Sequence, residues 1–252
     1  RVPKDYDAKR LDAYRVLVIF GGRNNTGKAD VTGRLGWGEW ADKQGVFLVC
    51  PGFKDDNYWE PKTWSGKALS DALVLIGKKY KIGQSKLLFY GYSAGSQCSN
   101  LFPAWRPDQT RAWVSHACGY FHTPSAVMRG VPGLVTCGDA DVERYIISRR
   151  FVESYRKYGV DVIWRSYPNH PHDVPPDSLE LARAFLAFYH NQYLSDLRYS
   201  GMAGRVKPEK PAFIGDMEDY NYHPAESIAA KNILPEDQVF LPSKEVAEAW
   251  KK

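Results

Sequence analysis

The chain has 252 residues, 44% of them hydrophobic and 25% charged, so it is long enough to bury a sizeable core and shows no bias toward a disordered or fibrous protein. Its net charge is +5, but lysine and arginine are scattered along the sequence, so we expect no nucleic acid as a partner. No run approaches the roughly eighteen uninterrupted apolar residues of a membrane span. The chain begins at Arg1 rather than Met, and we expect that an N-terminal segment has been removed.

Short apolar runs alternate with longer amphipathic stretches along most of the chain. The apolar runs predict strands at 15–22, 45–52, 86–93, 111–119, 133–139 and 161–168. The amphipathic stretches predict helices near 65–81, 94–105, 144–158 and 177–192. This alternation predicts an α/β domain with a mostly parallel central sheet flanked by helices.

The character of the sequence changes after about Leu197. Residues 198–252 contain five prolines and few periodic runs. We therefore predict a main domain over 1–197 and a C-terminal extension over 198–252 that packs on it and ends in a short helix near 243–251.

The pentapeptide Gly91-Tyr92-Ser93-Ala94-Gly95 follows a predicted strand and precedes a predicted helix. Its pattern, G-x-S-x-G, is that of a turn that exposes a nucleophilic serine, and the strand–turn–helix setting is the one this motif requires. A serine at so tight a turn needs very small neighbours two positions away, a condition that both glycines meet. The alternative is an ordinary glycine-rich turn before a helix.

A serine nucleophile needs a histidine base and an acid that orients it, and in this kind of fold they follow in the order serine, acid, histidine. Asp139 and Asp141 come directly after the strand predicted at 133–139. His170 and His172 lie in the loop between the last predicted strand and the last long helix, and we favour His172. The two histidines are alternatively a fragment of a metal site, although no third ligand lies nearby in the sequence.

An oxyanion hole needs two N–H donors. The turn points the Ala94 backbone N–H toward the space above Ser93. The loop after the first strand, FGGRNNTG, is expected beside the nucleophile turn. We expect the second donor of the oxyanion hole to be the N–H of Gly22 or of Arg23 in this loop. The alternative for this loop is a flexible connector.

These residues carry a resemblance. Three segments resemble parts of bacterial serine esterases of the α/β-hydrolase superfamily. The opening strand of those enzymes resembles VPKDYDAKRLDAYRVLVIFGG, and their nucleophile elbow resembles GYSAGSQCSNLFPAWRPDQTRAWVSHACGYF. Their acid and histidine segments resemble GDADVERY…SYPNHPHDVPPDSLELARAF. The likeness covers about 2–192 and is greatest to the feruloyl and acetylxylan esterases and the polyhydroxyalkanoate depolymerase-like enzymes. It implies an α/β-hydrolase fold with the catalytic domain in 1–197, no cofactor or metal, and secretion or a periplasmic location.

The resemblance also selects among the candidate residues. The family pattern G-x-x-D fits 138–141 and favours Asp141 as the acid, and the segment before the family histidine aligns with 168–172 and favours His172. The chain departs from the family at Phe20, where a histidine is usual, and at Ser96, Asn169 and Pro171, where glycines are usual. None of these departures removes a reacting group.

The segment between the fourth and fifth predicted strands is short, so we predict no large lid domain and an open site. Aromatic residues cluster in the loop after 45–52, and with Trp37 and Trp40 we expect them at the active edge of the sheet. Tyr58, Trp59 and Trp64 are the predicted substrate-binding residues, and core or loop anchoring is the alternative. We therefore predict an ester hydrolase acting on a bulky or carbohydrate-linked ester. The alternatives are a serine peptidase or amidase, and a non-catalytic binding protein of the same fold.

Overall fold

The computed structural model describes residues 1–10, 14–23, 28, 33, 35–54, 57–82, 86–200 and 211–252, with the backbone alone for 193–200. The chain divides into two compact units, Arg1–Thr123 (unit 1) and Pro124–Lys252 (unit 2).

The strands of unit 1 run parallel in the order β2-β1-β3-β4. They are β1 (Arg15–Phe20), β2 (Val46–Val49), β3 (Leu87–Tyr92) and β4 (Thr110–His116). Every residue of β1 and of β4 is buried. Strands that are covered on both faces read as continuous apolar runs rather than as alternating ones, which is why the sequence predicted each of these four within a few residues.

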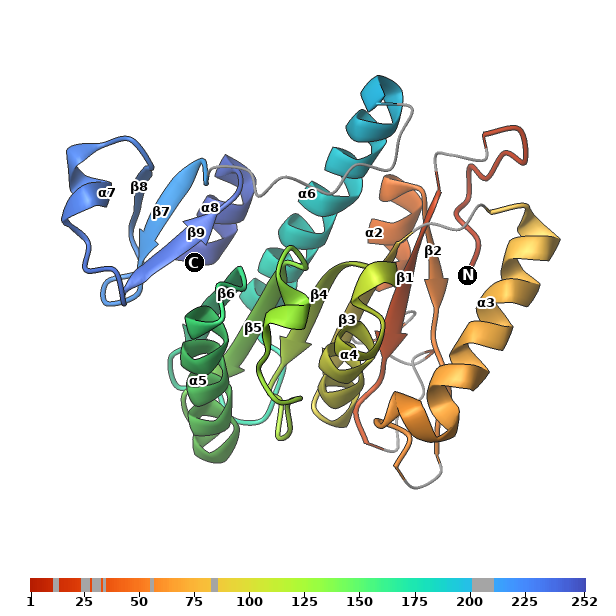
Figure 1. The fold of residues 1–252 in the computed structure, drawn as a ribbon, viewed down its shortest axis with the longest axis horizontal. Helices are drawn as coiled ribbons and strands as arrows, with labels where there is room; N and C mark the ends of the chain where they lie inside the picture. Colours follow the sequence, from red (N-terminus) through yellow and green to blue (C-terminus); the bar gives the residue numbers. More distant parts are fainter. Residues whose placement is uncertain are drawn as a thin grey trace. The chain divides into compact units, whose positions relative to one another are not determined.

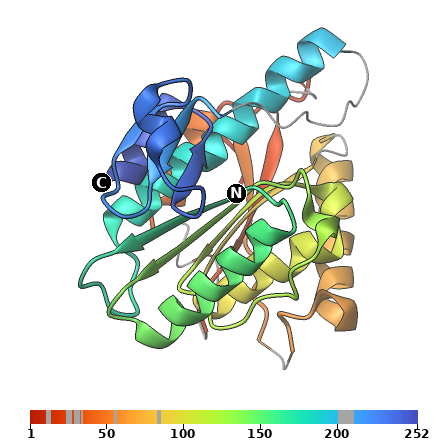
Figure 2. The ribbon, with the colours of Figure 1, turned by 60° about the vertical axis from the view of Figure 1, so that its left-hand side comes forward.

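Helices cover both faces of this parallel sheet. The helical elements of unit 1 are α2 (Trp37–Gln44), the π-helical turn η2 (Pro61–Ser65), α3 (Gly66–Tyr80), α4 (Ala94–Trp105) and the 3₁₀ turn η3 (Pro107–Gln109). Figures 1 and 2 show α3 and α4 on one face and α2 on the other. The sequence analysis missed α2, a short helix bounded by left-handed glycines at 36 and 45.

The first helical element of unit 2 is the 3₁₀ turn η4 (Ala126–Met128). The structure describes all residues between β4 and β5 (Gly133–Gly138), and η4 is the only helical element among them. The parallel strands of unit 2 are β5 and β6 (Val162–Tyr167). The helix α5 (Val142–Lys157) follows β5, and α6 (Pro176–Ser200) follows β6. These elements lie where the sequence predicted them.

The end of unit 2 forms a small α+β layer that the sequence analysis did not foresee. Its elements are β7 (Phe213–Asp216), β8 (Tyr222–Pro224), α7 (Ile228–Asn232), β9 (Gln238–Leu241) and α8 (Lys244–Lys251). The strands pair antiparallel in the order β8-β7-β9. We call 211–252 the C-terminal module. The boundary at 197/198 stays a prediction, whereas the expected terminal helix is present as α8.

Across the described part of the chain, no helix is both long enough and apolar enough to cross a bilayer.

Candidate active site

Ser93 lies at the abrupt junction of β3 and α4. Its backbone has φ 55° and ψ −123°, a left-handed conformation that side chains other than glycine rarely adopt. The Ser93 N–H donates to the carbonyl of His116 at the end of β4, at 3.0 Å. Strain of this kind costs about 1–3 kcal/mol and is typical of functional positions.

The two glycines of the motif are required by close backbone contacts. A Cβ at Gly91 would lie 2.1 Å from the carbonyl oxygen of Gly95. A Cβ at Gly95 would lie 2.2 Å from the carbonyl oxygen of Phe20 and 2.5 Å from that of Gly21. The turn therefore closes on itself at Gly91, and at Gly95 it packs against the end of β1.

This packing brings the predicted oxyanion loop beside the serine. Gly22 is buried and Arg23 is exposed, directly after the carbonyls that contact Gly95. Ala94 is the first residue of α4, so its N–H belongs to the positive end of the helix dipole and has no partner within the helix. Ala94 thus begins the helix at this turn, and the residues directly before Gly22 and Arg23 pack on the same turn.

The acid and the histidine meet within unit 2. His172 Nδ1 lies 2.6 Å from Asp141 Oδ2, and the Asp141 side chain is only 5% exposed. Asp141 precedes α5, and His172 lies in the loop between β6 and α6. The serine half of the predicted triad is in unit 1, and its acid–histidine half is in unit 2.

The two residues that compete with this pair have other partners. Asp139 Oδ1 accepts from the backbone N–H of Asn169 at 2.6 Å, so this carboxylate holds the histidine loop rather than the imidazole. His170 Nδ1 lies 3.3 Å from Asp173 Oδ2, and both side chains are partly exposed. The geometry thus favours Asp141 over Asp139 and His172 over His170.

Sequence reasoning missed a contact to the Asp141 carboxylate and a set of contacts made by the helix that follows Ser93. Arg144 Nη1 lies 3.6 Å from Asp141 Oδ1, the oxygen that does not face the imidazole. In unit 1, Asn100 Oδ1 accepts from the His122 N–H at 2.9 Å, and Asn100 Nδ2 donates to Tyr120 at 3.1 Å. The first is an i, i+3 pair that helix spacing could have indicated. The second joins α4 to a loop distant in sequence, and no local pattern reveals it.

Two buried thiols and one buried imidazole of unit 1 are uncharged at neutral pH. Burial raises the pKa of the Cys98 thiol and raises that of Cys118 to about 12, so both stay protonated. Burial also lowers the pKa of His122 to about 4, which keeps its imidazole neutral. Among the described residues, no group of three or more His, Cys, Asp and Glu is arranged to hold a metal ion.

The predicted substrate-binding aromatics lie in unit 1, on the loop after β2. Tyr58, Trp59 and Trp64 are all half-buried. The rings of Tyr58 and Trp59 meet edge to face at 5.2 Å, and the sulfur of Cys98 on α4 lies 4.0 Å from the Tyr58 carbonyl. This loop therefore packs on the helix that begins at the nucleophile turn, with part of each ring open to solvent.

Trp37 does not belong to this aromatic rim, and the expectation for it was wrong. It is fully buried on α2, where its ring packs 4.7 Å from that of Tyr90. A buried aromatic and an exposed one look alike in a sequence, and the helix that buries Trp37 was itself not predicted. Trp40, on the same helix, is half-buried.

No protein-family model matches the sequence, and no curated protein matches it. Solved structures do match. The poly(3-hydroxybutyrate) depolymerase LpqC from Bordetella parapertussis has a TM-score of 0.55 and 17% identity over 81% of this chain and 85% of that one. A ferulic acid esterase has a TM-score of 0.56 and 16% identity over 76% and 90%.

The chain has the α/β-hydrolase fold. A third match, an uncharacterized protein from Bacillus cereus, has a TM-score of 0.59 and 15% identity over 76% of this chain and 64% of that one. The fold predicted from the sequence is therefore confirmed. At these identities the likeness establishes the fold alone.

Proposed function

We propose that the protein is a serine carboxylic-ester hydrolase that uses Ser93, His172 and Asp141. The observation that carries this proposal is the strained backbone of Ser93, locked between two glycines that tolerate no Cβ. A non-catalytic turn has no need of so costly a conformation at a serine. The ester-cleaving structural neighbours and the 2.6 Å contact between Asp141 and His172 support the same proposal.

In the proposed reaction, Ser93 Oγ attacks the acyl carbonyl while His172 Nε2 accepts its proton. Asp141 holds Nδ1–H of the same ring, which fixes the tautomer and stabilises the imidazolium that forms. The N–H of Ala94 and that of Gly22 or Arg23 stabilise the oxyanion. His172 then protonates the leaving alcohol, and it later activates a water molecule that releases the acid and restores Ser93.

We further propose a bulky or carbohydrate-linked ester as substrate. The half-exposed rings of Tyr58, Trp59 and Trp64 offer faces on which a sugar or a phenolic ring can stack. Burial raises the pKa of the Tyr58 hydroxyl, so the group stays neutral and can donate a hydrogen bond at working pH. The short connection between β4 and β5 suits an open site that admits a large substrate.

The test is covalent labelling of the purified protein by a fluorophosphonate, with the labelled peptide identified by mass spectrometry. Ser93 should be labelled in the wild type and not in Ser93→Ala. His172→Ala should label at least about a hundredfold more slowly. His170→Ala is the matched control on the same loop and should label at nearly the wild-type rate.

Activity on matched substrates separates the remaining alternatives. We expect hydrolysis of acetyl and feruloyl esters that exceeds hydrolysis of the corresponding anilides. Faster hydrolysis of anilides would favour a peptidase or amidase. A folded protein that neither reacts with the probe nor cleaves either substrate would favour a binding protein and would overturn the proposal.

A further inference from the structure

The strand that leads to the histidine loop has one free edge. β6 pairs with β5, and no strand in the described part of the chain pairs with its other side. The carbonyls of Asp161 and Tyr167 face β5, because they accept from Gly133 N–H at 3.1 Å and Asp139 N–H at 3.0 Å. Since strand carbonyls alternate in direction, those of the even-numbered residues of β6 point outward.

Side chains occupy this outward edge in place of a strand. The carbonyl of Trp164 accepts from Trp250 Nε1 at 2.8 Å, and that of Ser166 accepts from Arg165 Nη1 at 2.5 Å. Trp250 lies on α8 of the C-terminal module and is fully buried. The module therefore supplies a hydrogen bond that an edge strand otherwise takes from water or from another chain.

Tyr220, also in the module, makes a second contact with the same strand. Its hydroxyl lies 2.6 Å from Ser166 Oγ, and its ring lies 3.7 Å from the guanidinium carbon of Arg165, which is buried. Tyr220 has φ 55°, a conformation that is strained for a residue of its size. An observed outlier of this kind points to a functional constraint on the residue that bears it.

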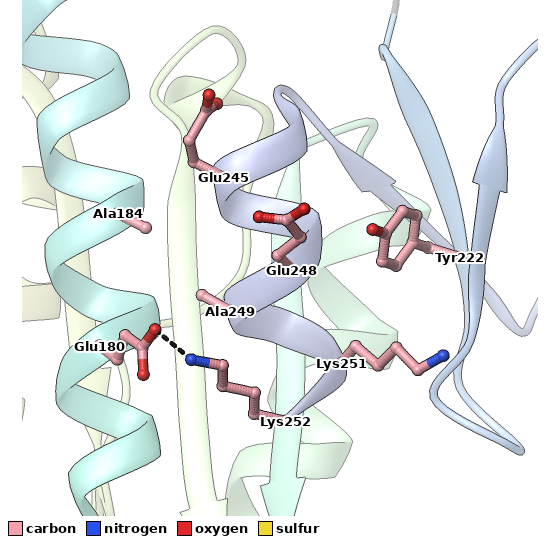
Figure 3. A pocket seen from close by; sticks show the side chains of 8 residues that line it. All are labelled: Glu180, Ala184, Tyr222, Glu245, Glu248, Ala249, Lys251 and Lys252. Carbon is pink, nitrogen blue, oxygen red and sulfur yellow. Dashed lines mark hydrogen bonds and ion pairs between the residues drawn. The ribbon is translucent and has the colours of Figure 1, made fainter.

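The helix that carries Trp250 is itself fastened to the rest of unit 2. Lys252, directly after α8, has its Nζ 2.5 Å from Glu180 Oε1 of α6, across a groove of about 690 Å³ (Figure 3). On its other side the Trp250 ring fills the space beside Gly215, where a Cβ would lie 2.7 Å from it. The ring thus has one well-defined position from which its N–H reaches β6.

The position of β6 determines the position of the catalytic histidine loop. The loop begins directly after Tyr167 and is tied to the acid loop by the bond from Ala140 N–H to the His170 carbonyl, at 3.1 Å. At Gly138 a Cβ would lie 2.1 Å from that same carbonyl, so the two loops are in close contact. A displacement at the end of β6 is therefore passed to the pair of Asp141 and His172.

We propose that Trp250 and Tyr220 are positioning residues, through which the C-terminal module holds β6 and keeps His172 on Asp141. Neither side chain touches the reacting atoms. Each acts through a contact to the strand that precedes the histidine loop. This role deepens the proposed esterase function and gives the C-terminal module a part in it.

The test removes the two hydrogen-bonding groups with Trp250→Phe and Tyr220→Phe. Tyr220→Phe preserves the ring, whereas Trp250→Phe replaces the indole with a smaller aromatic ring. The first readout is the downfield proton NMR signal of the hydrogen bond between His172 and Asp141, identified by its loss in Asp141→Asn. The second is kcat and KM on a small acetyl ester. Lys244→Gln is the control, because it breaks the exposed ion pair between Lys244 and Glu248 within the same helix and does not touch β6.

We expect the NMR signal to broaden or disappear in both Phe variants. We expect kcat to fall about fivefold at unchanged KM, a factor that corresponds to the net free energy of one hydrogen bond. The control should match the wild type in both. An unchanged signal and kcat in folded Trp250→Phe and Tyr220→Phe would overturn the positioning role, even if both variants were less stable. Because the NMR signal needs no substrate, it tests this role separately from the esterase proposal, which fails if Ser93 does not react.

Discussion

A methyl group at position 95 is expected to separate the oxyanion loop from the nucleophile. The Cβ of Gly95→Ala would lie 2.2 Å from the carbonyl oxygen of Phe20, whereas an ordinary contact is at least 3.4 Å. Relief therefore requires the end of β1 and the turn to separate by about 1.2 Å, since both contacting groups are backbone. Overpacking of this kind costs about 1–3 kcal/mol of unfolding free energy, and a displacement of about 1 Å at reacting groups lowers kcat roughly a hundredfold.

The assay is urea unfolding together with kcat on a small acetyl ester. Gly45→Ala is the matched control. Gly45 adopts a left-handed conformation, with φ 68°, which Gly95 does not, and nothing lies within 4 Å of its Cβ position. This control should lose about 1 kcal/mol of stability through strain and keep its activity. If Gly95→Ala were as stable and as active as Gly45→Ala, the close packing of the oxyanion loop on the turn would be refuted.

Three further predictions follow from the same geometry. Asp141→Asn should lower kcat by about three to four orders of magnitude at little change in KM, because the amide no longer fixes the imidazole tautomer; Asp139→Asn should be far milder. Trp59→Ala should raise KM for feruloyl esters about tenfold and leave small acetyl esters unaffected, and equal effects on both would argue against stacking. Burial lowers the pKa of His122 to about 4, whereas the pKa in an unfolded chain is about 6.5. Between pH 4 and pH 6.5 the imidazole therefore takes up a proton when the protein unfolds. The contribution of His122 to the free energy of unfolding should therefore be fully present above about pH 6.5 and should fall by roughly 3 kcal/mol toward pH 4. Urea titrations of His122→Gln should show a smaller fall in the free energy of unfolding over that pH range.

The sequence was sufficient for the features that are set by local chemistry. Apolar runs specified the parallel strands because strands covered on both faces are rich in apolar side chains. The turn at Ser93 was predictable because only glycine fits at 91 and 95, so its steric requirement is written in the residue types. The order of serine, acid and histidine, together with the positions of the loops after the predicted strands, then limited the candidates to two carboxylates and two imidazoles.

What the sequence could not decide depends on contacts between distant residues. Asp139 and Asp141 look alike until the N–H of Asn169 is seen to take the carboxylate of the first. The burial of Trp37 depends on α2, a helix too short for its periodicity to be detected, and the contact of Trp250 with β6 depends on how the predicted terminal helix packs. The small sheet of the C-terminal module consists of three- and four-residue strands, below the length at which alternation is informative. The natural ester and the predicted export stay predictions.

The most direct test of the proposed triad is a crystal structure of the protein after reaction with a fluorophosphonate. We expect phosphorus bonded to Ser93 Oγ, one phosphonyl oxygen accepting hydrogen bonds from the N–H of Ala94 and from that of Gly22 or Arg23, and His172 Nε2 within about 3 Å of an oxygen on phosphorus. An adduct on Ser93 with the His172 imidazole turned away, and no other histidine beside it, would contradict the proposed mechanism.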